Sequence, residues 1–222
     1  MMKAFAPAEE AQATVEQSGA VVTYLVPAVV TIPPDGAQHK VVIARYPLTP
    51  KLDYVSAPSV VQAVYRRAKV ANASPYTLLS GKANLFAGDD FLGATTLELV
   101  PPQGEIELYL GVDDRIKVER ELKRREVEKT LIGGKRRLHY GYELRLENLL
   151  GVEAQLTLHD RIPIPRHEEI KVRLETIEPK PVEQNGLNLL KWEMSLPPGE
   201  KRTIHFEFTV EFPQILEVLG LP

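Results

Sequence analysis

The second half of the chain alternates regularly between apolar and polar positions. From Leu138 to Leu146 every second residue is apolar, and His139, Glu143 and Arg145 are among the residues between them. Successive side chains of a strand point to opposite faces, so this segment is predicted to be a strand with one buried face. The same alternation predicts strands at about 116–127, 152–158, 170–174, 190–196 and 204–212. One apolar and one polar face per strand is typical of a two-layer β-sandwich.

The first half is less regular but is also predicted to be β-structure. Short runs rich in Val, Ile, Tyr and Leu are separated by turn signals such as Pro33-Pro34-Asp35-Gly36 and Pro101-Pro102-Gln103-Gly104. Residues 83–95 read as a hairpin that turns at Gly88-Asp89-Asp90, and 40–46 as a further strand. No segment from 20 to 213 keeps a helical apolar period over three turns, so the predicted class is all-β.

We expect two β-sandwich-like lobes. The predicted division is 1–19 as a linker or disordered tail, 20–112 as the first lobe, 113–213 as an immunoglobulin-like sandwich and 214–222 as a tail. Six strands in roughly 100 residues match the size of an immunoglobulin-like sandwich, with Trp192 as its core anchor. The pattern leaves open whether the lobes share a sheet, and whether the apolar tail packs on a lobe or binds a partner.

Composition mainly excludes classes of function. The 27 basic and 30 acidic residues leave a net charge of −3, which removes the usual electrostatic reason to expect nucleic acid as a partner. The chain has no cysteine, so disulfides, thiol nucleophiles and cysteine-bound metal centres are excluded. No cofactor is predicted.

No leader or membrane span is predicted for this chain. Residues 1–7 lack the apolar core of a signal peptide. The longest apolar stretch, 20–32, is interrupted by polar residues and proline and is shorter than the ~20 residues of a spanning helix. We therefore expect an envelope or periplasmic location if the chain is a fragment of a longer protein, and a cytoplasmic one otherwise.

Several segments resemble the C-terminal domain of mucoidy-inhibitor A-type bacterial proteins. They include VTIPPDG at 30–36, KANLFAGDDFLG at 82–93 and LGVDDRIKV at 110–118, and the resemblance continues through 142–148, 160–163 and 192–212. It covers about residues 20 to 213. The resemblance implies an all-β domain of unknown function without established catalytic residues. It also implies an upstream β domain and coiled coil joined by a linker, whose end 4–18 resembles, so the chain is expected to be a domain fragment or a shortened homologue.

Histidines offer the candidate metal ligands. His159-Asp160 and His167-Glu168-Glu169 flank a proline-rich segment and supply nitrogen and oxygen ligands. If consecutive strands pair directly, His139 and His159 lie opposite each other, whereas in an immunoglobulin-like fold the chain often crosses to the other sheet and separates them. The candidate set is His139, His159, His167 and Glu169. Its spacing matches no dedicated metal motif, and solvated surface histidines are the competing interpretation.

The segment 115–137 is the most basic part of the chain, with ten Lys or Arg residues against four Glu. If its two arms form a hairpin around Gly133-Gly134, two basic triplets could together attract a polyanion or an acidic glycan. The triplets are Lys123, Arg124, Arg125 and Lys135, Arg136, Arg137. The competing interpretation is a solvated edge whose charges discourage aggregation.

No catalytic motif is found in the sequence. There is no Gly-x-Ser-x-Gly elbow and no glycine-rich phosphate loop. The leading hypothesis is a non-catalytic protein-interaction or structural module that binds another protein, or an upstream domain and coiled coil of its own protein. A polyanion-binding module is the alternative, a metal-dependent hydrolase is the third class, and homo-oligomerisation stays open.

Overall fold

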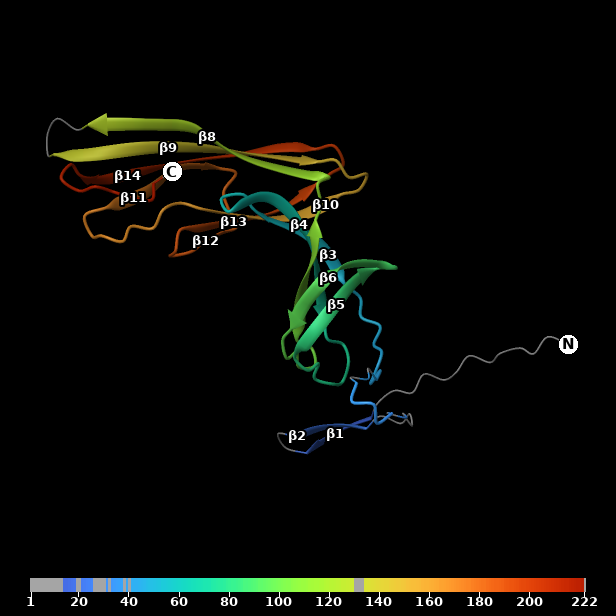
Figure 1. Ribbon diagram of the computed structural model, residues 1–222. Coiled ribbons are helices and arrows are strands. Elements are labelled where there is room, and N and C mark those ends of the chain that lie inside the picture. The colour runs from blue at the N-terminus through green and yellow to red at the C-terminus, as the bar shows by residue number, and fades with distance from the viewer. Residues whose placement is uncertain are drawn as a thin grey trace. The chain divides into compact units, whose positions relative to one another are not determined.

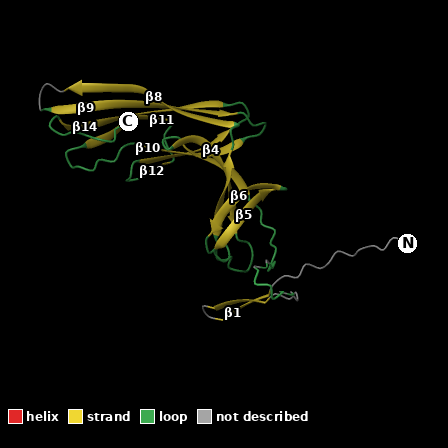
Figure 2. Ribbon diagram, viewed as in Figure 1, coloured by secondary structure: helices red, strands yellow, loops and turns green. Residues whose placement is uncertain are grey.

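Every regular element in the described part of the chain is a β-strand, so the predicted all-β class is confirmed (Figure 2). The structure is a computed structural model that describes residues 14–18, 21–25, 31, 33–37, 39, 41–129 and 134–221. None of these residues forms a helix that could cross a membrane.

A four-stranded sheet holds most of the largest fully buried side chains of the described residues. Its order is β11 (Lys171–Glu178), β14 (Lys201–Pro213), β9 (Lys135–Asn148) and β8 (Ile116–Lys129). The alternation on β9 is confirmed, because Tyr140, Tyr142 and Leu144 are all buried. The rings of Tyr140 and Tyr142 stack on those of Phe206 and Phe208 of β14, with ring centroids 5.2 to 6.2 Å apart.

A six-stranded sheet joins strands from both sides of the expected boundary at 112/113. Its order is β12 (Glu183–Gln184), β13 (Leu189–Leu196), β10 (Ala154–Arg161), β3 (Lys51–Ala57), β4 (Val61–Ala71) and β7 (Glu105–Val112). The link between the two halves of the sequence is the parallel pair β3–β10. The division into lobes at 112/113 stays a prediction, but residues 51–57 pair with a strand of the second half.

The two sheets pack face to face around one apolar core (Figure 1). Leu156, Leu158 and Trp192 come from the six-stranded sheet and meet the aromatic residues of β9 and β14. Trp192 is 2% exposed and its indole N–H donates to the Pro179 carbonyl at 2.9 Å, so its predicted place in the core is confirmed. The apolar tail also packs here, through Leu216, Val218 and Leu221.

The chain forms two compact units that are described separately. One comprises residues 1–49, 70–82 and 96–106, and the other comprises 50–69, 83–95 and 107–222. The sandwich core belongs to the second unit. The first unit contains β1 (Thr14–Ser18) and β2 (Val21–Leu25), which pair antiparallel.

A turn built on a buried asparagine occurs once in each unit. The side-chain amide of Asn148 donates to the carbonyls of Val152, Leu196 and Pro197 at 2.7 to 3.2 Å. Asn72 donates in the same way to Tyr76, Val100 and Pro101 at 2.7 to 3.1 Å. Each asparagine ends or follows a long strand and holds a Pro-Pro turn, at 197–198 or 101–102. The recurrence of this asparagine turn was not predicted from the sequence.

Three local expectations need correction. Residues 14–18, expected in a linker, form β1, while most of the rest of that linker lies outside the described residues. Residues 41–46, expected as a strand, have no regular structure, because no neighbouring strand pairs with them. Val152, expected to point inward, is 64% exposed because it lies in the bend before β10.

Candidate functional site

An arginine occupies an inward position of β8, where the pattern calls for an apolar residue. The register places Val118 opposite Leu146, Arg120 opposite Leu144 and Leu122 opposite Tyr142. Arg120 therefore shares the inner face with Val118, and its side chain is only 17% exposed. A charged side chain in this position requires a partner inside the sandwich.

That partner is Asp160, which comes from the opposite sheet. Asp160 continues the inward series Leu156 and Leu158 on β10, and its side chain is 0% exposed. The Arg120 Nε–H donates to Asp160 Oδ2 at 2.9 Å, and the Arg161 backbone N–H donates to Oδ1 at 2.7 Å. Burial raises the pKa of Asp160, and the Arg120 charge opposes that rise.

The arginine is also held by aromatic rings. Its guanidinium carbon lies 3.6 Å from the ring centroid of Tyr142 and 5.9 Å from that of Phe206. Cation–π contacts of this kind add attraction where water is excluded. The hydrogen bond to Asp160 uses only Nε of a group that has five N–H donors. Arg120 is therefore held both from the opposite sheet, by Asp160, and from its own sheet, by Tyr142.

Arg120 forms part of the lining of a cavity of about 850 Å³. The wall is mostly apolar and comes from β11, β14 and the loop after β10, together with the segment 217–221. Its polar members include three arginines, Arg120, Arg161 and Arg166, against one carboxylate, Glu217. A concave, mostly apolar cavity with few polar groups is the usual form of a small-molecule site.

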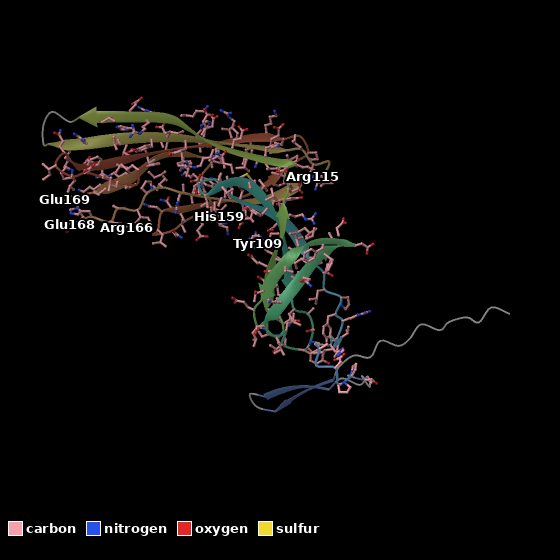
Figure 3. All side chains as sticks on the ribbon, viewed as in Figure 1. Tyr109, Arg115, His159, Arg166, Glu168 and Glu169 are labelled. Atoms are coloured by element: carbon pink, nitrogen blue, oxygen red, sulfur yellow. The ribbon has the colours of Figure 1, made fainter. Side chains whose placement is uncertain are left out.

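The two outer arginines of this cavity lack carboxylate partners. Arg161 and Arg166 are exposed, and neither forms an ion pair with any residue that the structure describes. Arg166 lies on the loop between β10 and β11, next to Glu168 and Glu169 (Figure 3), which do not line the cavity. The cavity therefore carries net positive charge, because its three arginines outnumber Glu217 and the Asp160 carboxylate that pairs with Arg120.

The predicted basic hairpin forms, but its two triplets do not face each other. Strands β8 and β9 pair antiparallel, with Arg125 opposite Tyr140 and Lys129 opposite Arg136. Arg125 and Arg137 therefore lie about three residues apart along the ribbon, roughly 10 Å. The expected single cluster is instead two separate groups of charge.

Glutamates neutralise most of these basic residues. Lys123 lies 2.7 Å from Glu121, and Arg124 lies 2.7 Å from Glu126. Lys135 and Arg137 share Glu211, at 2.8 and 2.9 Å, and these two ion pairs lower the pKa of Glu211 to about 2. Arg125 lies over the ring of Tyr140 at 6.0 Å, and Arg136 is exposed. This face thus carries interlocked charges of both signs, which favours the solvated-edge interpretation.

The candidate histidine pair is not formed. The chain crosses between sheets after β9, so His139 lies on the four-stranded sheet and His159 on the six-stranded one. His139 Nε2 lies 3.3 Å from Glu128, while burial, together with the charges of Lys191 and Arg67, lowers the pKa of His159. The condition of direct pairing is not met, and the chain crosses to the other sheet, which was the alternative that the sequence left open.

His167 and Glu169 lie together on the loop after β10. The His167 Nδ1 accepts a hydrogen bond from the backbone N–H of Glu169 at 3.2 Å, and the two side chains come within 3.9 Å. Both residues are exposed. Within the described ranges, no three His, Asp or Glu side chains are grouped so that they could hold a metal ion.

The predicted hairpin at 83–95 also forms and carries an exposed aromatic pair. Strands β5 (Gly81–Ala87) and β6 (Asp90–Leu97) pair only with each other. The two-residue loop begins with Gly88 at φ +61°, as in a type II′ turn. Phe86 and Phe91 are 58% and 60% exposed, and their ring centroids are 5.4 Å apart.

The interior ion pair was not predicted from the sequence, although the apolar and polar pattern of β8 and β10 contains its signal. Arg120 falls in phase with Ile116 and Val118, and Asp160 falls in phase with Leu156 and Leu158. Opposite charges in the apolar phase of two strands predict a buried pair. The cavity itself depends on how the loop after β10 and the tail pack, which no local pattern specifies.

Comparison with known proteins identifies a family without an assigned function. The family model described as "Domain of unknown function (DUF4139)" matches residues 4–214. "Protein F37C4.5" of Caenorhabditis elegans is 26% identical over 195 residues, which cover 82% of this chain and 35% of that protein. The chain therefore spans about a third of the length of this curated relative. No solved structure matches.

Proposed function

We propose that this chain, which belongs to the DUF4139 family, is a non-catalytic interaction module that binds another protein through its β5–β6 hairpin. The observation that carries the proposal is the exposed pair Phe86 and Phe91. Large aromatic side chains are the usual anchors of protein interfaces.

The exposure of these two rings to water does not stabilise the hairpin. An isolated two-stranded ribbon is marginally stable, and almost every residue of β5 and β6 is exposed or half-buried. Leu92, 37% exposed, adds apolar surface on the opposite face of the ribbon, because successive strand residues alternate between faces. A partner that covers this surface would stabilise the ribbon by burying apolar area.

The charge at the tip indicates the chemistry of the partner. Asp89 and Asp90 lie next to Phe91 at the turn and are exposed. The complementary surface is therefore an apolar groove with a basic rim. Such a groove accepts the two rings in its centre and pairs the two carboxylates at its edge.

We also propose the family group, the sandwich type and the location that the sequence predicted. The motifs at 82–93 and 110–118 support membership of the mucoidy-inhibitor A-type group, and the two-sheet core supports an immunoglobulin-like sandwich. A role within a longer, envelope-associated protein accords with the one-third coverage of the relative. A bacterial source is not required, because the relative is a nematode protein.

Site-specific photo-crosslinking in the source cells tests the proposal. p-Benzoylphenylalanine replaces Phe91 in the full protein, and in a matched control it replaces Glu119, whose side chain is 68% exposed on the charged edge strand β8. We expect one discrete cross-linked protein from position 91 and none from position 119. The Asp89→Lys/Asp90→Lys variant should lose that product.

Two outcomes would refute the proposal. The first is the same product, or no product, from both positions. The second is a product from position 91 that persists unchanged after the charge reversal.

A further inference from the structure

We propose that the cavity lined by Arg120, Arg161 and Arg166 binds a small anionic amphiphile, a molecule with one apolar chain and a carboxylate or phosphate head. This site is separate from the β5–β6 hairpin and does not depend on the proposed protein partner.

The size and wall of the cavity favour a ligand over empty space. Its volume of about 850 Å³ lies within the usual range for small-molecule sites, about 300–1,000 Å³. Ile170, Val172, Phe208 and Val210 offer no hydrogen-bonding side chains to ordered water. An apolar chain suits this wall.

The charges select the head group. The cavity is lined by three arginines and one carboxylate, Glu217. Asp160 neutralises the innermost arginine, Arg120, at 2.9 Å. Arg161 and Arg166 keep their charge for an incoming group, and guanidinium groups match carboxylate and phosphate geometry. A cationic amphiphile would meet like charge here.

The basic β8–β9 hairpin is a poorer anion site than the cavity, because most of its positive charges are already paired. Lys123, Arg124, Lys135 and Arg137 are each paired with a glutamate within 2.7 to 2.9 Å. An anion at that face would have to displace an existing carboxylate. At the cavity it would meet arginines without one, beside an apolar wall.

The segment 217–221 forms one side of the cavity. Val218 and Leu221 pack against the sandwich core, whereas Leu219, also in the lining, is 84% exposed. Figure 1 shows the C-terminal end close to β11 and β14. A ligand chain inside the cavity would add apolar contacts to this segment, so binding should stabilise the protein.

Isothermal titration calorimetry with defined probes tests the inference on the whole chain. Decanoate, decyltrimethylammonium and acetate are titrated below micellar concentrations. We expect decanoate to bind at least about tenfold more tightly than decyltrimethylammonium, since its carboxylate can accept charge-assisted hydrogen bonds from the arginines, whereas the ammonium group meets like charge. Acetate, which lacks the chain, should show no measurable binding.

Variants identify the cavity as the site. Arg161→Gln/Arg166→Gln should weaken decanoate binding about tenfold. Ile164→Ser, at a lining position that is 50% exposed, should weaken it through lost apolar contact. The matched control, Arg124→Gln/Arg137→Gln on the β8–β9 hairpin, should bind decanoate unchanged. All five positions are at least partly exposed to solvent, and unchanged melting temperatures will verify that each variant is folded.

The inference is overturned if decanoate does not bind, if the two decyl probes bind equally, or if the Arg161/Arg166 variant retains full affinity. A Phe86→Ser/Phe91→Ser variant should bind decanoate normally. Failure here would leave the proposed protein partner untouched, and failure of the crosslinking test would leave this site untouched.

Discussion

Arg120 and Asp160 illustrate how single residues can depart from a strand pattern without breaking the fold. Each takes an apolar position, and each removes the other's electrostatic penalty inside the core. The pair also receives support from the Tyr142 ring and the Arg161 backbone N–H. A buried ion pair of this kind is costly to break but contributes little compared with a well-packed apolar pair.

The pair should therefore show strong coupling when it is mutated. Asp160→Ala leaves the Arg120 charge unpaired in the core and should lower the free energy of unfolding by about 3–5 kcal/mol. Arg120→Met/Asp160→Leu should lower it much less. Urea denaturation of the two single variants and the double variant measures the coupling. Strictly additive losses would show that the two charges act independently.

Glu211 should give the stability an acid-side dependence. Its ion pairs with Lys135 and Arg137 lower its pKa from 4.5 to about 2 in the folded protein. The stabilisation is therefore complete above pH 4.5 and is lost as the pH falls towards 2. Glu211→Gln should cost about 1 kcal/mol at pH 7, as for a partly exposed network, and markedly less at pH 2, where Glu211 is already partly protonated. Chemical denaturation at both pH values checks this, and an equal cost at both would contradict it.

At the scale of elements, the alternation of apolar and polar residues predicted a strand correctly where the segment has a neighbouring strand and an apolar core beneath it. Segment 138–146 was placed correctly because β14 pairs with it along its whole length and its apolar side chains pack in the core. Residues 41–46 are also rich in apolar residues but have no regular structure. A strand requires a neighbour for its backbone hydrogen bonds, and the neighbour is a property of the whole sheet. Glycine chemistry, in contrast, correctly predicted the turn of the β5–β6 hairpin.

The asparagine turns should be stability elements of their own units. Asn148 and Asn72 are each fully buried, and each donates to three backbone carbonyls. Asn148→Asp replaces the donor with a carboxylate against those carbonyls, and it should cost more than about 3 kcal/mol. Asn72→Asp should have the same effect on the first unit.

Hydrogen exchange distinguishes these two variants. Asn148→Asp should reduce amide protection mainly in β9, β10 and β14, and Asn72→Asp mainly in residues 70–82 and 96–106. As a control, Asn185→Asp alters an exposed turn residue and should leave both regions protected. Equal, global loss of protection in both variants would contradict independent roles.

At the scale of the whole molecule, chain order did not reveal how the strands are assembled into sheets. The parallel pair β3–β10 joins segments about one hundred residues apart. The crossing after β9 separated His139 from His159, although their sequence spacing suited a direct pair. The cavity and the Arg120–Asp160 ion pair both arise from contacts between the two sheets. Residue chemistry could nominate Arg120 and Asp160, but only the assembly of the sheets brings them to 2.9 Å.

The central claim is that the β5–β6 hairpin is covered by a protein partner in the cell. Because the chain contains no cysteine, one introduced thiol reports on one position. Phe91→Cys and the control Glu119→Cys are labelled with a maleimide, first in the purified protein and then in intact source cells. We predict equal labelling rates in the purified protein, and in cells at least about tenfold slower labelling for Phe91→Cys alone. Equal rates for the two variants in cells would contradict the claim.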